Sequence, residues 1–502
     1  MKRLSFILLL VMSVMQGFAQ PKREFRGAWI QCVNGQYLGK SPEQLQQMLS
    51  GQLDVLKSAG INAILFQVRA EGDALYRSAY EPWSRYLTGQ QGKAPAYAWD
   101  PLEWMVTECH RRGMECHAWI NPYRAKTAGT KEVAANHIAA THPERLFQYG
   151  DLLIFNPALE VNRQYTCMII EDILTRYDVD GLHMDDYFYP YPTAGQVIPD
   201  QANYAADPRG FNTIEDWRRD NVNLLIRDIH NLVRRVKPWI KFGISPFGIY
   251  RNSPDGTNSK AGSATRGTQN YDDLYADIVL WQEKGWVDYL IPQIYWNIGY
   301  AVADYKVLCE WWNEYCGKRP LYIGQDVERT VKEADPQNPN VHQMMAKYDI
   351  QRSLSNVQGS CQWYAAAVVD NPGSYRTMLE QQYHKYPALQ PLMPWIDKKA
   401  PKKVSKLSIL FQSGNGLLCS GKIYLTWKAP KAKDELDKAT AYAVYRFAPG
   451  EKVKINADDA THLVGVVREP HYLLEGNQTG CTFVVTALDR LQNESKPVKV
   501  KL

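Results

Sequence analysis

The sequence predicts an α/β protein in which a (β/α)8 TIM barrel precedes a small all-β sandwich domain. Between residue 25 and about residue 390, short apolar segments alternate with amphipathic segments of helical period, and eight such pairs close a parallel barrel. Beyond residue 405 the chain has only short alternating segments, which are typical of a β-sandwich. A doubly wound open sheet is the alternative, but no glycine-rich phosphate loop follows the first strand.

Eight segments carry the short apolar pattern of buried parallel strands. They span residues 25–31, 62–69, 114–121, 179–186, 241–247, 287–296, 321–326 and 360–369. The amphipathic segments between them predict helices, several of which start at a capping or first-turn residue, such as Ser41-Pro42, Asp100-Pro101 and Thr213. Examples of these helices span residues 42–59, 101–112, 214–236, 271–284, 303–315 and 374–386.

The loops that follow the predicted strands are longer than the loops that precede them. Residues 70–99, 122–160, 187–213 and 248–270 each follow a strand, and the barrel region reaches about 365 residues against a typical ~250. Enzymes with this fold carry their active sites on the face that such loops form. The sequence therefore predicts a deep, loop-walled cleft at the carboxyl ends of the strands.

Composition divides the chain into four parts. Residues 1–19 carry the two basic residues, the apolar run and the final small residues of a secretory signal peptide. Residues 20–395 are the predicted barrel, residues 396–405 a basic linker and residues 406–502 the predicted sandwich. The signal predicts export to the periplasm or the extracellular space. No later segment approaches the ~20 apolar residues of a membrane span, so no stable membrane insertion is expected.

Charge and cysteine content disfavour several classes of protein. The net charge of +5 is small for 502 residues and the basic residues are scattered, which disfavours nucleic-acid binding. Nine cysteines in a chain of this length do not make a disulfide scaffold. Cys109 with Cys116, and Cys309 with Cys316, could pair, but buried free thiols fit at least as well. No nucleotide or zinc-protease motif is present, so no cofactor is expected.

Strand alternation predicts which side chains line the barrel. In the fourth strand the apolar Leu182 and Met184 must meet the helices, so His183 and Asp185 point into the barrel. The inward residues on the other strands are then Gln67, Arg69, His117, Trp119, Asn121, Ser245, Phe247, Gln293, Tyr295, Tyr322, Asp326, Gln362 and Tyr364. A barrel with only a structural role would fill this layer with Val, Ile and Leu, so the pattern indicates a polar ligand. The deeper His117 and His183 also fit hydrogen-bonded core histidines.

Two adjacent carboxylates, Asp185 and Asp186, end the fourth strand and lead into a run of aromatic residues and prolines. Carboxylates at a strand tip beside flat rings are what hydrolysis of a glycosidic bond requires. We predict Asp185 as nucleophile, base or transition-state stabiliser, with a proton donor among Asp186, Asp73, Asp326 and Glu328. The predicted substrate-binding residues are Gln67, Arg69, Trp119, Asn121, Tyr123, Arg124, Tyr187, Tyr189, Ser245, Gln293, Tyr295 and Trp296.

Each of these carboxylates also has a structural interpretation. Asp185 could serve only as a salt-bridge partner of Arg69, and Asp186 could cap the next turn. The other proton-donor candidates fit turns or other structural roles. Because adjacent residues of a regular strand face opposite sides, Asp185 and Asp186 can act together only if the strand breaks at its tip.

Six motifs, in chain order, resemble those of one known family. They are Phe25-Arg-Gly-Ala-Trp, Phe66-Gln-Val-Arg with Gly72-Asp-Ala-Leu-Tyr, His117-Ala-Trp-Ile-Asn-Pro-Tyr-Arg, Val179-Asp-Gly-Leu-His-Met-Asp-Asp-Tyr-Phe-Tyr-Pro, Gly243-Ile-Ser-Pro-Phe-Gly and Pro292-Gln-Ile-Tyr-Trp. They are similar to motifs of the glycosyl-hydrolase-like ten family of bacterial envelope proteins, over most of residues 24–390. The resemblance implies a (β/α)8 barrel with glycoside hydrolase activity, and some members act on peptidoglycan glycan strands. The region after residue 405 resembles fibronectin type III modules.

The fourth strand also resembles, more distantly, the Asp-Gly-x-Asp-x-Asp-x-Glu-Tyr-Pro signature of chitinase-type hydrolases. Asp185 falls on the last aspartate, which positions a substrate N-acetyl group in those enzymes. Tyr187 stands where their acid glutamate would be. The acid would then come from Asp186, from the sixth or seventh strand, or from a loop.

The sequence thus predicts an exported glycoside hydrolase whose partner is a polysaccharide, with peptidoglycan-type cell-wall strands as the expected substrate. A non-catalytic envelope glycan-binding protein is the first alternative, because the proton donor is not identified. A metal-dependent polysaccharide deacetylase is the second, because Asp185 and Asp186 could hold a divalent ion. His137 and His142 are five residues apart, a poor ligand spacing for one helix face. The linkage cleaved and the oligomeric state do not follow from the sequence.

Overall fold

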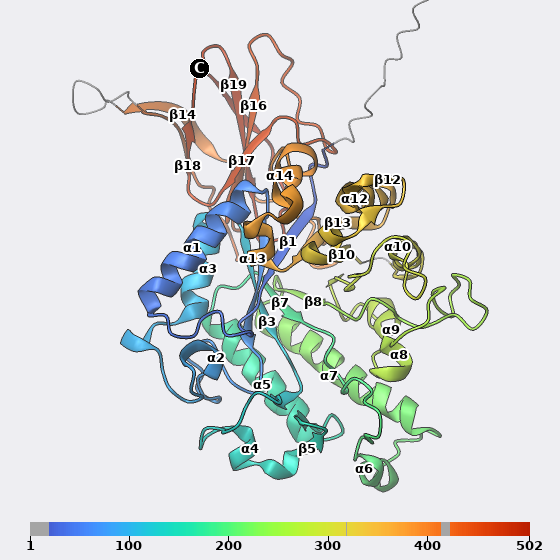
Figure 1. Cartoon of the computed structure of the whole chain (residues 1–502). Coiled ribbons are helices and arrows are strands. Elements are labelled where there is room, and N and C mark those ends of the chain that lie inside the picture. Colours follow the sequence, from blue (N-terminus) through green and yellow to red (C-terminus); the bar gives the residue numbers. More distant parts are fainter. Residues whose placement is uncertain (1–19, 318, 413–421) are drawn as a thin grey trace, which may run out of the picture.

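The computed structural model describes residues 20–317, 319–412 and 422–502 (Figure 1). In this part of the chain, eight parallel strands close a barrel in the order β1-β13-β10-β9-β8-β7-β3-β2, which confirms the predicted fold class. The strands are β1 (Phe25–Ile30), β2 (Ala63–Arg69), β3 (Glu115–Ile120), β7 (Gly181–Met184), β8 (Lys241–Ile244), β9 (Tyr289–Leu290), β10 (Leu321–Asp326) and β13 (Val357–Trp363). The predicted signal peptide lies outside the described residues.

Helices surround the barrel, and their starts follow the capping signals in the sequence. Ser41 and Gln44 form a capping box before α1, while Asp100 and Thr213 accept backbone hydrogen bonds at the starts of α3 and α7. The longer helices are α1 (Pro42–Ser58), α3 (Pro101–Arg111), α5 (Glu160–Arg176), α7 (Ile214–Val236), α10 (Tyr305–Tyr315) and α12 (Met344–Ser353). The shorter ones are α2 (Arg85–Thr88), α4 (Ile138–Thr141), α6 (Gln201–Ala206), α8 (Asn270–Asp273), α9 (Ile278–Glu283), α11 (Val327–Lys332), α13 (Ala365–Asp370) and α14 (Tyr375–Met378). Within the described residues no helix is long and apolar enough to cross a membrane.

Four predicted elements differ from the structure. The strand predicted over residues 287–296 pairs regularly only at Tyr289–Leu290, because Pro292 has no N–H to donate to the ladder. The strand predicted over 360–369 ends at Trp363, and the alanine-rich segment after it forms α13. The helix predicted over 271–284 divides into α8 and α9 around Tyr275, whose φ is +54°. The helix predicted over 374–386 becomes α14 followed by a π-helical segment, Leu379–Tyr383.

The residues of the eighth barrel strand that face inward are also not the predicted ones. Cys361 and Trp363, rather than Gln362 and Tyr364, belong to the aromatic interior of the barrel. Gln362 instead bonds to tyrosines of the helical layer. Its polar residues Ser360 and Gln362 meet tyrosines of the helical layer and its apolar residues face the interior, so the rule that apolar residues face the helices gives the wrong phase here. Its pairing with β10 also contains a register shift. A one-residue slip exchanges the two faces of a strand.

The C-terminal part of the chain forms a small all-β domain of two antiparallel sheets. One sheet has the order β14-β15-β18 and the other has the order β17-β16-β19-β20. These strands are β14 (Ser405–Gln412), β15 (Lys422–Lys428), β16 (Ala441–Phe447), β17 (Leu463–Val467), β18 (His471–Leu474), β19 (Thr482–Leu488) and β20 (Val498–Lys501). The likeness to fibronectin type III modules and the exact domain boundaries stay predictions. The described cysteines are free thiols, and Cys419 lies outside the described residues.

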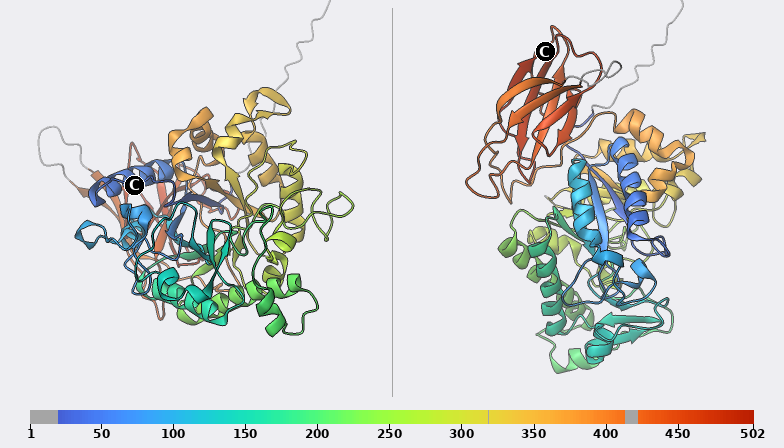
Figure 2. Two further views of the ribbon diagram at one scale, coloured as in Figure 1. Left: turned by 60° about the horizontal axis from the view of Figure 1, so that its bottom comes forward. Right: turned by 90° about the vertical axis from the view of Figure 1, so that its left-hand side faces the viewer.

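The C-terminal sheets dock on the end of the barrel where the strands begin (Figures 1 and 2). Leu491, in the loop between β19 and β20, is 1% exposed and packs in the same apolar cluster as Phe25 and Met393 under the barrel interior. Arg468 donates to Asp180, directly before β7, at 2.9 Å. The base of the barrel is therefore closed by apolar packing and by a largely buried ion pair, and the opposite end remains for the long loops.

Leu491→Ala should destabilise the barrel as well as the small domain, because the side chain fills space in a shared cluster. We expect a loss of about 2–5 kcal/mol in the free energy of unfolding, measured by urea denaturation with tryptophan fluorescence. The control is Leu410→Ala, since Leu410 is 53% exposed on β14 and should change stability by less than about 0.5 kcal/mol. Equal stability of the two variants would contradict the shared packing.

Candidate active site

The long loop regions after β2, β3 and β7 gather at the end of the barrel remote from the C-terminal sheets (Figure 1). Figure 1 places α2, α4 and α6 there, together with a small antiparallel sheet of order β4-β6-β5. That sheet consists of β4 (Arg124–Lys126), β5 (Leu146–Tyr149) and β6 (Leu152–Phe155), and a further hairpin is made by β11 (Ala334–Asp335) and β12 (Asn338–His342). The carboxyl ends of the barrel strands point into this region, which is the position of active sites in this fold.

Asp185 lies directly after β7, which ends at Met184, and its side chain points into the barrel mouth. Trp119 Nε1 donates to Asp185 Oδ2 at 3.0 Å, and Asn121 Nδ2 lies 3.4 Å from Oδ1. The residue is only 4% exposed. Burial, together with the negative charge of Asp186, raises the pKa of Asp185 to about 7, and the nearby Arg124 opposes the shift. Asp185 therefore holds a proton that it can exchange near neutral pH.

Asp186 is also buried, and its carboxylate faces a different set of donors. The Tyr191 hydroxyl donates to Asp186 Oδ2, and Gln293 contributes a further side-chain hydrogen bond. Burial raises the pKa of Asp186, and these two bonds and Arg124 oppose the shift. Because β7 ends before both aspartates, the alternation of a regular strand no longer separates them. The two carboxylates are close enough for each charge to disfavour the other.

An aromatic wall extends from this carboxylate pair along the mouth. The Arg124 guanidinium lies 3.4 Å from the centroid of the Tyr187 ring. Successive centroids are 5.8 Å apart for Tyr187 and Tyr191, 5.8 Å for Tyr191 and Phe247, and 5.4 Å for Phe247 and Trp296. These rings come from the segments that follow β7, β8 and β9. Such a wall offers flat apolar faces to a ligand that also needs hydrogen bonds.

A second aromatic group lies beneath the pair, inside the barrel. The Trp363 ring is 6.1 Å from Trp29, 6.2 Å from Trp119 and 6.3 Å from Tyr295, measured between centroids. Trp29 and Trp119 are nearly fully buried, and Tyr295 and Trp363 are half-buried. The floor of the mouth is therefore rigid and apolar, except where Trp119 donates to Asp185.

A chain of hydrogen bonds continues from this floor down the barrel axis. Trp29 Nε1 donates to His183 Nε2 at 3.1 Å, so the neutral imidazole of His183 carries its proton on Nδ1. His183 Nδ1 then donates to the Tyr289 hydroxyl at 3.2 Å, and that hydroxyl donates to His117 Nδ1 at 2.8 Å. His117 consequently donates from Nε2 to Glu115 at 3.0 Å. Burial lowers the pKa of His183 well below its usual value, in agreement with the neutral ring.

The chain of bonds ends at the base of the barrel on a charged pair. Lys241 Nζ donates to Glu115, and both side chains are almost fully buried. The positive charge of Lys241 lowers the pKa of Glu115 against the opposing effect of burial, so the carboxylate can accept the His117 proton as an anion. Each polar group of this chain of bonds therefore has a partner, and the two histidines are core residues.

Sequence comparison places this arrangement in a known group of proteins. A family model described as Glycosyl hydrolase-like 10 matches residues 24–342, which include the barrel strands from β1 to β10. The chain belongs to the glycosyl hydrolase-like 10 family. The resemblance that the six motifs predicted is therefore confirmed.

Two curated relatives carry the name glycosyl hydrolase. YngK of Bacillus subtilis (strain 168) is 39% identical over 498 residues, covering 96% of this chain and 94% of the relative. DigH of Escherichia coli (strain K12) is 37% identical over 292 residues, covering 56% of this chain and 65% of the relative. Among solved structures, the PgaB (BpsB) glycoside hydrolase domain of Bordetella bronchiseptica matches with a TM-score of 0.45 at 12% identity, over 72% of this chain and 99% of that one.

The other three carboxylates predicted as proton donors form hydrogen bonds with groups other than Asp185 and Asp186. Asp73 is fully buried after β2 and accepts hydrogen bonds from the Glu71 backbone at 3.2 Å and from Gln91 at 3.3 Å. Burial, then the charge of Glu71, raises the pKa of Asp73 to about 6. Asp326 caps α11 by accepting from the Arg329 backbone at 2.9 Å. Glu328 is exposed on α11 and accepts from a tyrosine hydroxyl.

The predicted substrate-binding residues divide into two groups. The group around Asp185 and Asp186 consists of Trp119, Asn121, Arg124, Tyr187, Ser245, Gln293, Tyr295 and Trp296, of which Gln293 donates to the Ser245 carbonyl at 3.0 Å. The group with buried structural contacts consists of Gln67, Arg69, Tyr123 and Tyr189. In this second group, Gln67 accepts from the Cys32 backbone and Tyr189 accepts from Asn221, each at 3.0 Å.

The interpretation of Arg69 as the partner of Asp185 is wrong. Arg69 is fully buried and forms a bidentate ion pair with Glu81, with Nη2 at 2.7 Å from Oε1 and Nε at 2.8 Å from Oε2. Its Nη1 donates to the Asn121 carbonyl, and the guanidinium lies 5.3 Å from the centroid of the Phe155 ring. Glu81 belongs to the long loop after β2, so this ion pair fixes the loop to the mouth.

The two histidines considered as metal ligands do not converge. His137 is buried, caps α4 and bonds to the Glu71 carbonyl at 2.8 Å. His142 is exposed and lies 3.2 Å from Glu144. Within the described residues no group of three or more His, Cys, Asp or Glu side chains has a geometry that could hold a metal ion.

Four residues of the mouth were absent from the predicted site residues, although strand alternation had placed one of them, Phe247, inward. Trp29 shares the inward face of β1 with Phe25, so strand alternation applied to β1 would have found it. Tyr191 lies in the aromatic run after Asp186, but nothing in that run distinguishes the tyrosine that turns back to the carboxylate. Trp363 was missed because the phase of β13 was reversed.

The free energy of unfolding of Asp185→Asn, relative to that of the wild type, should be higher at high pH than at low pH. A carboxyl whose folded pKa is raised contributes stability below its unfolded pKa and loses that contribution as pH rises through about 7. The shift from 3.8 to about 7 corresponds to roughly 4 kcal/mol. We therefore expect the stability difference, variant minus wild type, to increase by up to that amount between pH 4 and pH 8. Urea denaturation at both pH values measures it.

The matched control for this measurement is Asp151→Asn, which alters an exposed aspartate in the turn between β5 and β6. Its difference from the wild type should not depend on pH. A stability difference for Asp185→Asn that is also constant from pH 4 to pH 8 would show that the carboxyl titrates normally.

Tyr289→Phe should break the axial chain of hydrogen bonds without changing its packing. The substitution leaves the Nδ1 atoms of His183 and His117 without the hydroxyl between them, at a cost of about 1–3 kcal/mol for each unpaired group. Chemical denaturation should show this loss, whereas Tyr300→Phe, at a residue 41% exposed, should show none. An unchanged stability of Tyr289→Phe would refute the assigned chain.

Proposed function

We propose that this protein is a glycoside hydrolase that cleaves O-glycosyl bonds of a bacterial glycan, with Asp185 and Asp186 as the working carboxylates. The observation that carries the proposal is the pair itself: two buried carboxyls after β7, each raised in pKa, beside an aromatic wall. Hydrolysis of a glycosidic bond uses one carboxyl that is protonated and a second that is ionised. Family membership supports the same reaction class.

The contacts of the two aspartates favour different roles. Asp185, with a pKa of about 7, is the group that holds a proton near neutral pH and can give it to a leaving oxygen. This assignment reverses the roles expected from the sequence, in which Asp185 was the nucleophile, base or stabiliser and Asp186 a candidate proton donor. Asp186 accepts bonds from Tyr191 and Gln293, which favour its ionised form, and it would stabilise positive charge on the sugar ring or attack it. Asp73 and Asp326 are occupied by backbone donors and enter this scheme only as second candidates.

The proposed substrate is a strand of cell-wall glycan of the peptidoglycan type. The wall from Tyr187 to Trp296 supplies rings on which pyranose rings can stack, and Arg124 and Gln293 supply hydrogen bonds. Two relatives are named glycosyl hydrolases, which agrees with a glycan substrate. The predicted signal peptide would deliver the protein to the compartment that contains this polymer.

A non-catalytic glycan-binding function is the second candidate, and one observation favours it. Both carboxylates come from a single strand tip, whereas the carboxylates of a glycosidase normally flank the bond from two sides. A binding protein would keep the aromatic wall and hold glycan strands without releasing products. The two functions differ in whether the polymer becomes shorter.

Asp185→Asn and Asp186→Asn should each lower turnover by at least ~10²-fold, because a neutral amide can neither give the proton nor stabilise the positive charge. The mature protein is incubated with bacterial glycan strands, with and without stem peptides, and products are read by mass spectrometry. In the wild type, activity should fall as pH rises above about 7, since Asp185 then loses its proton. Asp151→Asn is the control and should retain full activity.

The products distinguish the candidate functions. Oligosaccharides released by the wild type and not by the Asp185 variant support hydrolysis, and their masses identify the bond. Retention of the strands with no product from any variant supports the binding function. Release of acetate in place of sugars, with loss of activity on chelation, would support a deacetylase.

A further inference from the structure

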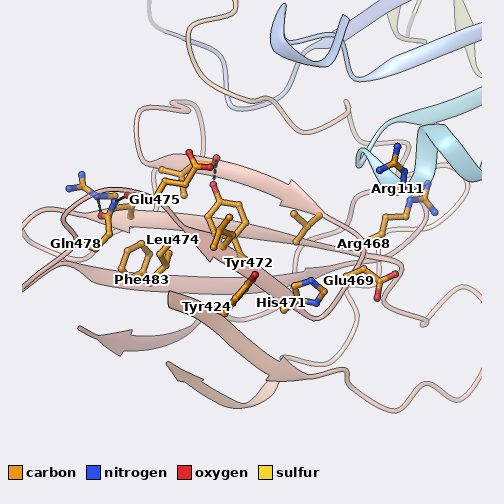
Figure 3. A pocket seen from close by; sticks show the side chains of 14 residues that line it. Arg111, Tyr424, Arg468, Glu469, His471, Tyr472, Leu474, Glu475, Gln478 and Phe483 are labelled. Carbon is orange, nitrogen blue, oxygen red and sulfur yellow. Dashed lines mark hydrogen bonds between the residues drawn. The ribbon is translucent and has the colours of Figure 1, made fainter. Parts of the chain in front are cut away.

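A cavity of about 520 Å³ lies on the C-terminal domain, away from the barrel mouth (Figure 3). It is bounded by β17 and β18, which are edge strands of the two sheets, and it reaches the end of α3. We call it the sandwich cavity and define it by Tyr424, Arg446, His471, Tyr472 and Gln478. Its volume is within the ~300–1,000 Å³ of ordinary small-molecule sites.

The walls of the sandwich cavity are fixed by contacts between the sheets. Tyr472 lies on β18 and donates its hydroxyl to the Val464 carbonyl on β17 at 2.9 Å. The Tyr472 ring lies so close to Gly465 that a Cβ there would approach it to 2.5 Å, so the glycine is what lets the ring cross the edge of the sheet. The Tyr424 and His471 rings meet edge to face with centroids 6.1 Å apart. The cavity therefore has preformed aromatic faces.

Polar groups in the sandwich cavity are arranged as a mixed set of donors and acceptors. Arg446 Nε donates to Gln478 Oε1 at 2.7 Å, which aligns two planar groups at one end of the cavity. Glu469 and Glu475 add acceptors, while Arg468 is already paired with Asp180. The lining thus carries no strong excess of one charge. Aromatic faces with balanced planar donors and acceptors match sugar rings, whose hydroxyls both donate and accept.

We propose that the sandwich cavity is a second glycan-binding site, which takes a short stretch of pyranose rings from the polymer that the barrel cleaves. The inference rests on the proposed function for the identity of the polymer. The cavity is separate from the barrel mouth. Arg468 borders the cavity and bonds to Asp180, which lies before the start of β7. Asp185 lies at the other end of β7, in the mouth. The two sites lie at opposite ends of the barrel and hold different segments of glycan.

The expected effect follows from the linkage of two sites in one chain. A polymer held by the sandwich cavity raises the local concentration of its own segments and of neighbouring strands at the mouth. The site should therefore matter for retention on long or insoluble glycan and not for turnover of short soluble oligosaccharides, which can occupy only one site at a time.

The test compares full-length mature variants in sedimentation with insoluble glycan strands freed of stem peptides. Tyr424→Ala combined with His471→Ala removes two rings that face the cavity. We expect the apparent affinity to fall by about tenfold or more, the change that ~1.4 kcal/mol of lost contact produces. Phe411→Ala is the control, because Phe411 is a 67% exposed ring on β14 of the same domain and does not line the cavity.

A second variant, Arg446→Ala, tests the polar end of the cavity and should also weaken retention. All variants should unfold at the same temperature and turn over short oligosaccharides at the wild-type rate. Equal retention of the wild type, the cavity variants and Phe411→Ala overturns the proposal, as does failure of every protein to bind the strands. Loss of retention without any cleavage by the wild type would support the second site and refute the proposed hydrolysis.

Discussion

The structure depends on one constraint: polar side chains that fill the barrel axis must all find partners away from water. The interior carries two histidines, a tyrosine and a glutamate in place of the aliphatic layers usual in this fold. Each unpaired group there would cost about 1–3 kcal/mol, so the bonds form one chain with a single direction. Glycines make it possible, because a Cβ at Gly181 or Gly243 would lie 2.5 Å from His117 or 2.0 Å from Tyr289.

The electrostatics of the mouth follow from this interior. Trp119 joins the aromatic floor to Asp185, and the neutral His183 beneath supplies no positive charge that would keep both aspartates ionised. Arg124 is the cation that acts on both carboxyls, and it does not offset their burial and mutual repulsion. The electrostatic free energy of two buried negative charges is then lowered only when the pair takes up a proton. A proton held near neutral pH is thus a consequence of how the barrel is filled.

The sequence was sufficient to predict the barrel fold and the inward direction of the Asp185 side chain, because both depend on local patterns. The apolar Leu182 and Met184 fix the phase of β7, and caps such as Asp100 fix helix starts. The prediction failed in β13, where the apolar Cys361 and Trp363 face the barrel interior and the polar Gln362 faces the helices, the reverse of the pattern in β7. It also could not find Glu81 as the partner of Arg69, because that pairing depends on the path of a long loop.

The strand β7 connects the two ends of the molecule. Asp180, before the strand, bonds to Arg468 of the C-terminal domain, and Asp185, after it, occupies the mouth. Leu491 and Met393 close the base beneath the axis, so water is kept from the Lys241–Glu115 pair and from the histidines above it. Opening that base would raise the local dielectric along the axis and weaken every interaction that holds the rings in place. Docking of the small domain is therefore part of what keeps the floor beneath Asp185 dry and ordered, although the domain lies at the opposite end of the barrel.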